Sequence, residues 1–130
     1  MITETESALK LLPKVEIHLH LDCSLSFDVV HKLRPQTTEI QYKNNFIAPE
    51  KCLNLADFLK CASSGINLMQ TKSELRAVVE DLFNQLKSEN VIYTEIRFAP
   101  LQHLRGGLSA EAVVEIVTDS IKSFADSSQV

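Results

Sequence analysis

The segment KVEIHLHLDCS, residues 14–24, carries histidines at positions 18 and 20 and a carboxylate at position 22. In a β-strand these alternate positions point to one face of the sheet. Residues i and i+2 of a strand lie roughly 6.5–7 Å apart. The imidazoles of His18 and His20 can therefore converge on one metal ion, at about 2.0–2.1 Å per Zn–N bond. The spacing favours a metal site, with Asp22 one pleat further on.

Two roles remain open for the histidine pair, because an HxH motif is a weak signal by itself. The rings could instead be partly buried and hydrogen-bonded to neighbouring groups. Asp22 lies toward the carboxyl end of the predicted strand, where the active-site groups of parallel α/β folds gather. This position suits contact with a bound ligand above the metal rather than burial beneath it.

The first element that must position these residues is the strand itself. Val15, Ile17, Leu19 and Leu21 have the opposite parity and are apolar. Residues 14–22 are therefore predicted to form a strand whose apolar face belongs to a core.

A second strand is predicted in VIYTEIRFAP, residues 91–100, which is rich in β-branched and aromatic residues and is closed by Pro100. Glu95 and Arg97 share one face of it. A buried arginine needs a carboxylate partner, and Glu16 and Glu95 are the candidates. We expect this pair to be structural rather than catalytic.

Helical spacing of apolar residues predicts four helices around the strands, with N-caps at Ser26, Asn54, Thr71 and Ser109. Gly65 is expected to interrupt or end the second helix.

Two loops are also expected. Residues 35–53 are polar and contain two prolines, so they are expected to form a loop. His103 is expected on another, exposed loop. Strands separated by helices pair in parallel, which predicts an α/β fold.

Composition narrows the function classes. The chain has 130 residues, a net charge of −4 and no basic cluster, which argues against a nucleic-acid partner. Its apolar runs fall short of the roughly 18 residues typical of a membrane helix, and its first residues lack the apolar core of a signal peptide. The three cysteines have no CxxC spacing, which favours a reduced, cytoplasmic location.

The segment LPKVEIHLHLDCSLS, residues 12–26, closely resembles the opening of the adenosine deaminase family, whose usual pattern is LPKxELHxHLDGs. The resemblance continues through LADFLKCA, LMQTKSEL, ENVIYTEIRFAPLQH and GLSAEAVVEIV, and it extends to about Phe124. The combination is far more specific than any one of these motifs.

This resemblance implies a (β/α)8 barrel of the TIM type and one catalytic zinc ion. His18 and His20 match the two N-terminal zinc ligands of the family. Asp22 matches an aspartate that contacts the ribose of the substrate. Phe58 and Leu59 match an apolar flap over the substrate, although ordinary core packing is the alternative for both.

Two residues depart from the family pattern. Cys23 stands where the family usually has glycine, a residue that permits positive φ and close approach of the backbone to a ligand. Ala62 stands where many members have an aromatic flap residue. Both departures bear on substrate affinity and catalytic competence.

The family pattern also requires a further histidine and aspartate as zinc ligands, a glutamate that donates a proton and a histidine that orients water. No matching motif follows residue 100, and a barrel takes about 250 residues. We therefore expect residues 1–130 to be one partial domain with no catalytic residue of its own. Its uncovered barrel edges would favour self-association.

The function expected from the resemblance is zinc-dependent hydrolysis of adenosine, a purine nucleoside, to inosine and ammonia, with the isolated chain inactive. Two alternatives stay open. The first is a deaminase of adenine or another adenosine derivative. The second is a non-catalytic, truncated remnant that acts as a binding module.

Overall fold

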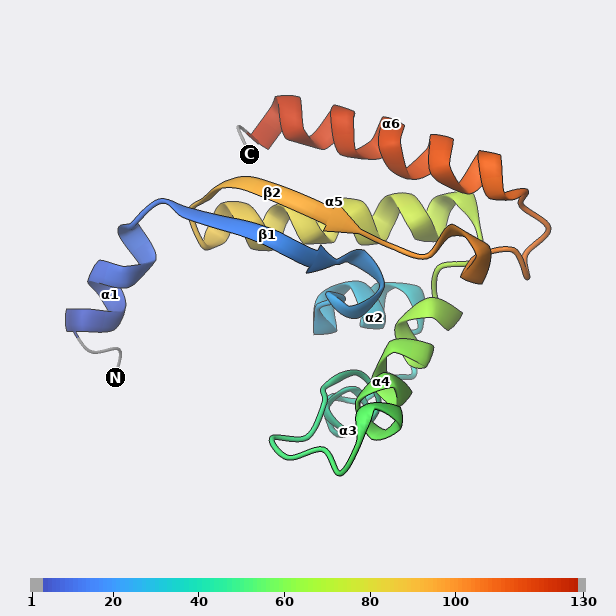
Figure 1. Ribbon diagram of the computed structural model, residues 1–130, viewed down its shortest axis with the longest axis horizontal. Coiled ribbons are helices and arrows are strands. Elements are labelled where there is room, and N and C mark those ends of the chain that lie inside the picture. Colours follow the sequence, from blue (N-terminus) through green and yellow to red (C-terminus); the bar gives the residue numbers. More distant parts are fainter. Residues whose placement is uncertain (1–3, 129–130) are drawn as a thin grey trace.

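The computed structural model describes residues 4–128 (Figure 1). Two parallel strands lie side by side, and helices pack along them. The predicted α/β class and parallel pairing are confirmed. The elements in chain order are α1 (Glu4–Leu11), β1 (Lys14–His20), the 3₁₀ turn η1 (Leu21–Cys23), α2 (Phe27–Leu33), α3 (Glu39–Phe46), α4 (Leu55–Asn67), α5 (Lys72–Ser88), β2 (Val91–Arg97), the 3₁₀ turn η2 (Pro100–Gln102) and α6 (Ala110–Ser128).

The core lies between α5, α6 and the helix side of the strands. Apolar residues of α5 repeat at helical spacing, so one stripe of this helix faces the core along its whole length. Its buried residues are Leu75, Val78, Val79, Leu82, Phe83 and Leu86. Val113 and Val117 of α6 are completely buried against them. Removing this apolar surface from water is the main stabilising contribution in the molecule.

The predicted N-caps are confirmed. The side chains of Ser26, Asn54 and Thr71 each accept a hydrogen bond from a backbone N–H in the first turn of the helix that follows. Ser109 Oγ accepts from the N–H of Ala112 at 3.1 Å. Asn90 follows α5 and has a φ of 55°. This is the left-handed conformation that often follows the end of a helix.

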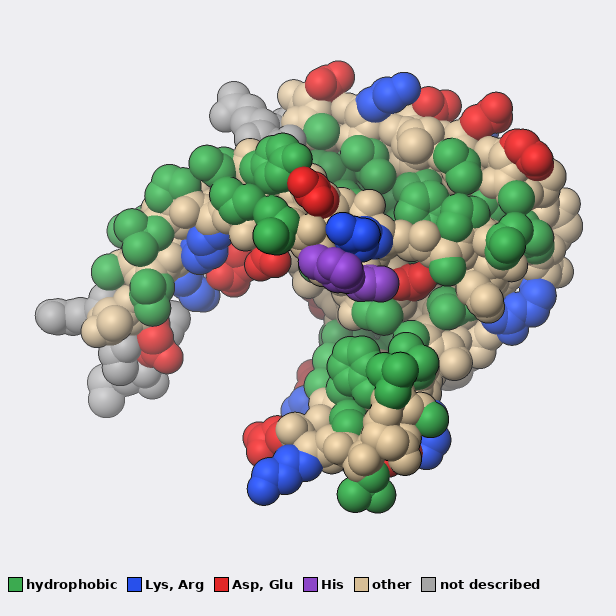
Figure 2. Space-filling model, viewed as in Figure 1, with side chains coloured by type: hydrophobic (Ala, Val, Ile, Leu, Met, Phe, Trp, Pro, Cys, Tyr) green, Lys and Arg blue, Asp and Glu red, His purple; other side chains and the backbone are tan. Residues whose placement is uncertain are grey.

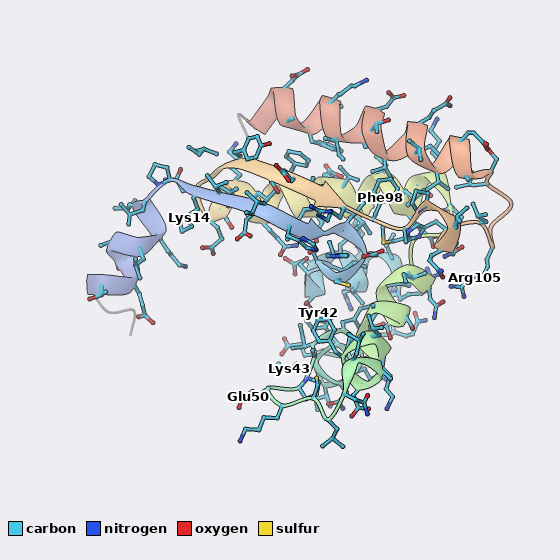
Figure 3. All side chains as sticks on the ribbon, viewed as in Figure 1. Lys14, Tyr42, Lys43, Glu50, Phe98 and Arg105 are labelled. Carbon is cyan, nitrogen blue, oxygen red and sulfur yellow. The ribbon has the colours of Figure 1, made fainter. Side chains whose placement is uncertain are left out.

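The predicted loop at residues 35–53 is wrong, because α3 occupies its centre. Thr38 and Gln41 form a capping box at the start of this helix. Tyr42 stacks on Phe46 with 5.6 Å between ring centroids, and its hydroxyl donates to the carbonyl of Leu25 at 2.8 Å. These contacts anchor a short, mostly polar helix beside α4 (Figure 3).

The expectation that Gly65 breaks the second helix is also wrong. α4 continues through Gly65 to Asn67. Gly65 is buried, and a Cβ atom at this position would collide with the carbonyl oxygen of Asp22. Glycine is therefore needed here for the close approach of α4 to η1, not for a turn.

β1 is shorter and less regular than predicted. It ends at His20, and the next three residues form η1. Val15 pairs with Tyr93 but Leu19 pairs with Ile96, with a register shift between them. Because positions 93 and 96 lie on opposite faces of β2, Val15 and Leu19 do not share a face. The single apolar face predicted for this strand is therefore wrong.

The predicted buried ion pair on β2 is wrong as well. Arg97 is exposed, and no salt bridge involves it among residues 4–128. Glu95 instead accepts a hydrogen bond from the hydroxyl of Tyr93 at 3.1 Å. None of the helices in the described part of the chain is long and apolar enough to span a membrane.

Candidate metal and ligand site

His18 and His20 converge at the end of β1. Their Nε2 atoms are 3.1 Å apart, and the ring centroids are separated by 5.1 Å with a tilt of 39°. Figure 2 shows the histidines beside a hollow, between the projecting N-terminal segment and the lobe that contains α3 and α4. Both rings are exposed, so a solute can reach the two nitrogens.

The separation of the two nitrogens fits a shared zinc ion. Two nitrogens bound to one tetrahedral zinc at about 2.0–2.1 Å lie roughly 3.3 Å apart, close to the 3.1 Å observed between the Nε2 atoms of His18 and His20. The same distance also fits an N–H···N hydrogen bond between the rings. Imidazole nitrogens are ordinary zinc ligands, so the donor set suits the metal.

Asp22 lies beyond the strand, in η1, rather than on the strand face where the sequence placed it. Its Oδ1 is 3.7 Å from His20 Nδ1, and only 7% of its side chain is exposed. The carboxylate thus lies beside Nδ1 of His20, while Nε2 of the same ring faces His18. Cys23 Sγ also donates to Asp22 Oδ1, at 3.7 Å.

The apolar flap positions lie on α4. Phe58 is 49% exposed and Leu59 is 47% exposed, so neither is a core residue within the described chain. Phe58 lines a pocket of about 90 Å³ together with Cys23, Cys61 and Ala62. Figure 2 shows apolar side chains gathered on the α3–α4 lobe below the histidines. These side chains are available to cover a ligand at the end of β1.

His103 was expected on an exposed loop, and this expectation is wrong. The side chain is completely buried directly after η2, and its ring centroid is 6.5 Å from that of Phe98 (Figure 3). Its Nδ1 lies 3.0 Å from the carbonyl oxygen of Met69. A carbonyl oxygen can only accept a hydrogen bond, so Nδ1 is the donor.

The second nitrogen of this ring has an unusual position. His103 Nε2 is buried without a hydrogen-bond partner in the described chain. Burial lowers the pKa of His103, and the charge of Asp22 opposes this effect only in part. His103 is therefore a neutral histidine close to the ligand site. Its position after the end of a predicted strand is the one sequence signal that points to this site.

The histidine pair supplies two possible ligands for a metal ion. Among residues 4–128 there is no group of three or more His, Cys, Asp or Glu side chains that could hold a metal ion. Catalytic zinc sites typically have three protein ligands, so His18 and His20 alone do not complete one.

Comparison with known proteins decides the family. The sequence matches the family described as adenosine deaminase over residues 13–129. The chain belongs to the adenosine deaminase family. It is 38% identical to the adenosine deaminase of Streptococcus agalactiae serotype III (strain NEM316), an alignment that covers 92% of this chain and 38% of that protein.

Other relatives agree. The adenosine deaminase of Clostridium botulinum (strain 657 / Type Ba4) is 34% identical, over 87% of this chain and 36% of the relative. The chain thus spans less than two-fifths of the length of these curated relatives. This family assignment confirms the resemblance inferred from the sequence motifs.

A solved structure supports the fold. The crystal structure of adenine deaminase from Arthrobacter aurescens is similar with a TM-score of 0.71 and 20% identity, over 91% of this chain and 37% of that one. The chain folds as the first two βα units of a (β/α)8 TIM-type barrel, as predicted.

Proposed function

We propose that this chain supplies the N-terminal part, one partial domain over residues 1–130, of a zinc-dependent deaminase that hydrolyses adenosine to inosine and ammonia. The observation that carries the proposal is the 3.1 Å separation of the His18 and His20 Nε2 atoms at the end of β1. In this proposal both histidines are zinc ligands. When bound, zinc supplies an activated water for attack on the purine ring.

The residues around the pair have supporting roles. The Asp22 carboxylate orients His20 through Nδ1 and accepts a hydrogen bond from a ribose hydroxyl of the substrate. Phe58 and Leu59 shield the purine from water, which strengthens the polar contacts inside the site. Adenosine is favoured over adenine because relatives at 34–38% identity are adenosine deaminases.

The isolated chain lacks the means to complete this reaction. With two histidine ligands it falls short of the three protein ligands of catalytic zinc, and the remaining ligands and the proton donor belong to later barrel strands. We place the protein in the cytoplasm, consistent with its three free thiols, and propose no nucleic-acid or membrane partner.

A chimera tests the proposal in a complete barrel. Residues 1–130 replace the matched part of the Streptococcus agalactiae adenosine deaminase, and the product is assayed with adenosine and with adenine. We expect zinc-dependent turnover of adenosine in preference to adenine. His18→Ala and His20→Ala should each lose zinc and activity.

The matched control is His31→Ala in the same chimera. His31 lies on α2, where its Nδ1 contacts the carbonyl of Thr37 at 3.2 Å, and its loss should leave zinc content unchanged. Stoichiometric zinc in both the His18 and the His20 variant would show that the ligand assignment is wrong. Preference for adenine would overturn the substrate assignment alone.

A further inference from the structure

Helix α4 packs unusually closely on the turn that follows β1. Gly65 lies against the backbone of Asp22 so tightly that a Cβ atom would collide with its carbonyl oxygen. Cys61 is one helical turn before Gly65, so both residues lie on the α4 face that packs on η1. Cys23, the last residue of η1, is the immediate neighbour of Asp22. The two cysteines therefore face each other across this contact.

Two small pockets place the thiols together. Cys23 and Cys61 both line a pocket of about 10 Å³ that also touches Asp22 and Gly65. They also share the adjoining pocket of about 90 Å³ beside Phe58. Both thiols therefore border the same small space, and Cys61 is near enough to influence the ionisation of Cys23 electrostatically.

We propose that Cys23 and Cys61 are an oxidation site, at which hydrogen peroxide closes a disulfide that ties α4 to the end of β1. This inference does not depend on the proposed function, because it concerns only two thiols of the described chain. Cys23 is exposed and Cys61 is partly exposed, so a small oxidant reaches both.

The reaction proceeds in two steps. The Cys61 thiolate attacks one peroxide oxygen, the O–O bond breaks, and a sulfenic acid and hydroxide form. The Cys23 sulfur then attacks the Cys61 sulfur, its proton leaves with the hydroxyl group as water, and the S–S bond forms. Two thiols and one peroxide thus give one disulfide and two waters.

The order of the steps follows from the surroundings of Cys23. Although Cys23 is reachable from solvent, its partial burial, the Asp22 charge and the hydrogen bond to Asp22 together raise the pKa of the thiol to about 11. Because attack on the peroxide needs a thiolate, Cys61 rather than Cys23 makes that attack, and Cys23 loses its proton as its sulfur attacks in the second step.

Closure would change the candidate ligand site in two ways. The disulfide removes the thiol hydrogen that Cys23 donates to Asp22 Oδ1. It also links η1 covalently to the helix that carries Phe58 and Leu59, which restricts the motion of the apolar flap. Oxidation thereby couples the flap to the strand that bears the histidine pair.

Cys52 provides a matched control within the same chain. It lies before α4, and its Sγ contacts the carbonyl of Pro49 at 3.7 Å. It lines neither of the two pockets shared by the other cysteines. Three thiols allow three different disulfide pairs, and Cys23 and Cys61 are the pair that shares these two pockets.

The test treats the purified chain with hydrogen peroxide, digests it with trypsin without reduction, and identifies linked peptides by mass spectrometry. The three cysteines fall in separate tryptic peptides, residues 15–32, 52–60 and 61–72. We expect a linkage of 15–32 to 61–72 that disappears on reduction. Cys52→Ser should retain it, whereas Cys61→Ser should abolish it.

Hydrogen exchange of the oxidised chain gives a second readout. Amides of α4 should exchange more slowly in the oxidised than in the reduced wild-type chain, and the difference should disappear in Cys23→Ser. A predominant linkage through Cys52, or accumulation of sulfonic acid without any linkage, would overturn the proposal. Because the first readout uses the wild-type chain, it does not depend on the folding of any variant.

Discussion

The two sides of the β1–β2 sheet differ sharply. On the helix side, α5 buries its whole apolar stripe, and Val113 and Val117 of α6 are buried against it. On the other side, Val15, Ile17 and Tyr93 are each more than half exposed, while His18 and His20 meet at one point. The helix side is stabilised by contacts within the chain, whereas the open side presents the polar groups that suit a ligand.

Substitutions on the helix side should therefore affect stability, whereas substitutions on the open side should affect the candidate site. A buried side chain on the helix side loses packing when it is shortened, whereas an exposed one on the open side loses little.

The largest effect should come from Leu75→Ala in α5. Leu75 is completely buried, so its truncation should lower the free energy of unfolding by about 2–5 kcal/mol. The control Ile17→Ala, at a position 63% exposed, should change it by less than about 0.5 kcal/mol. Urea denaturation followed by circular dichroism measures both. Equal losses would contradict the assignment of the core to the helix side.

Gly65→Ala should have the next largest effect on the free energy of unfolding. The added methyl group meets the Asp22 carbonyl, so α4 must move away from η1, at a cost of about 1–3 kcal/mol. Ser63→Ala, on the exposed side of the same helix, is the control and should stay within about 0.5 kcal/mol of the wild type. If Gly65→Ala is instead stabilising, as helix propensity alone would suggest, the close contact is absent.

His103 should make stability depend on pH. Its pKa is lowered in the folded chain, so below pH 6.5 the unfolded state binds the proton more readily than the folded state does. Stability should therefore fall as the pH drops through and below this value, by at most about 1.4 kcal/mol per pH unit.

Two substitutions at His103 test whether this side chain causes the pH dependence. His103→Asn retains a donor for the Met69 carbonyl, and it should remove this pH dependence with a smaller loss of stability than His103→Leu. Denaturation curves at pH 5 and pH 7 provide the comparison. A pH dependence that persists in His103→Asn would assign it to other groups.

The smallest effect concerns the chemical reactivity of Cys23. With its pKa raised to about 11, alkylation of Cys23 by iodoacetamide should keep accelerating as the pH rises toward 11. Removing the charge beside it, in Asp22→Asn, should lower the pKa and accelerate alkylation at pH 8. Mass spectrometry of the tryptic peptides measures this rate. A rate that is unchanged in Asp22→Asn would show that the carboxylate does not act on the thiol.

Much of the helix side could be predicted from sequence, because the signals there are local. The spacing of Leu75, Val78 and Leu82 gives the buried stripe of α5, and the Thr71 capping box gives its start. Each signal concerns residues within a few positions of one another, and the fold satisfies all of them.

The errors arise where a distant contact decides the outcome. Glycine is needed at position 65 of the helix because the backbone of Asp22 lies against it, and the buried His103 donates a hydrogen bond from Nδ1 to the carbonyl of Met69. The register shift in β1 depends on its pairing with β2. α3 is the exception, because its capping box at Thr38 was visible locally and was hidden only by the polar composition of the segment.

The same distinction between local signals and distant contacts applies to the candidate site. The convergence of His18 and His20 follows from their alternation on one strand. The placement of Asp22 in a 3₁₀ turn, and its contacts with His20 and Cys23, depend on how η1 packs under α4. The roles of Asp22, Phe58 and Leu59 toward a substrate stay predictions.

We propose that His18 and His20 together bind a metal ion through their Nε2 atoms. Titrating the chain with zinc while recording the ¹⁵N spectra of its histidine rings tests this directly. We predict that the Nε2 resonances of His18 and His20 shift together, and that those of His31 and His103 do not. In His18→Ala the response of His20 should weaken markedly. If zinc leaves both Nε2 resonances unchanged, or shifts His31 or His103 instead, the assignment of the metal site to the end of β1 is wrong.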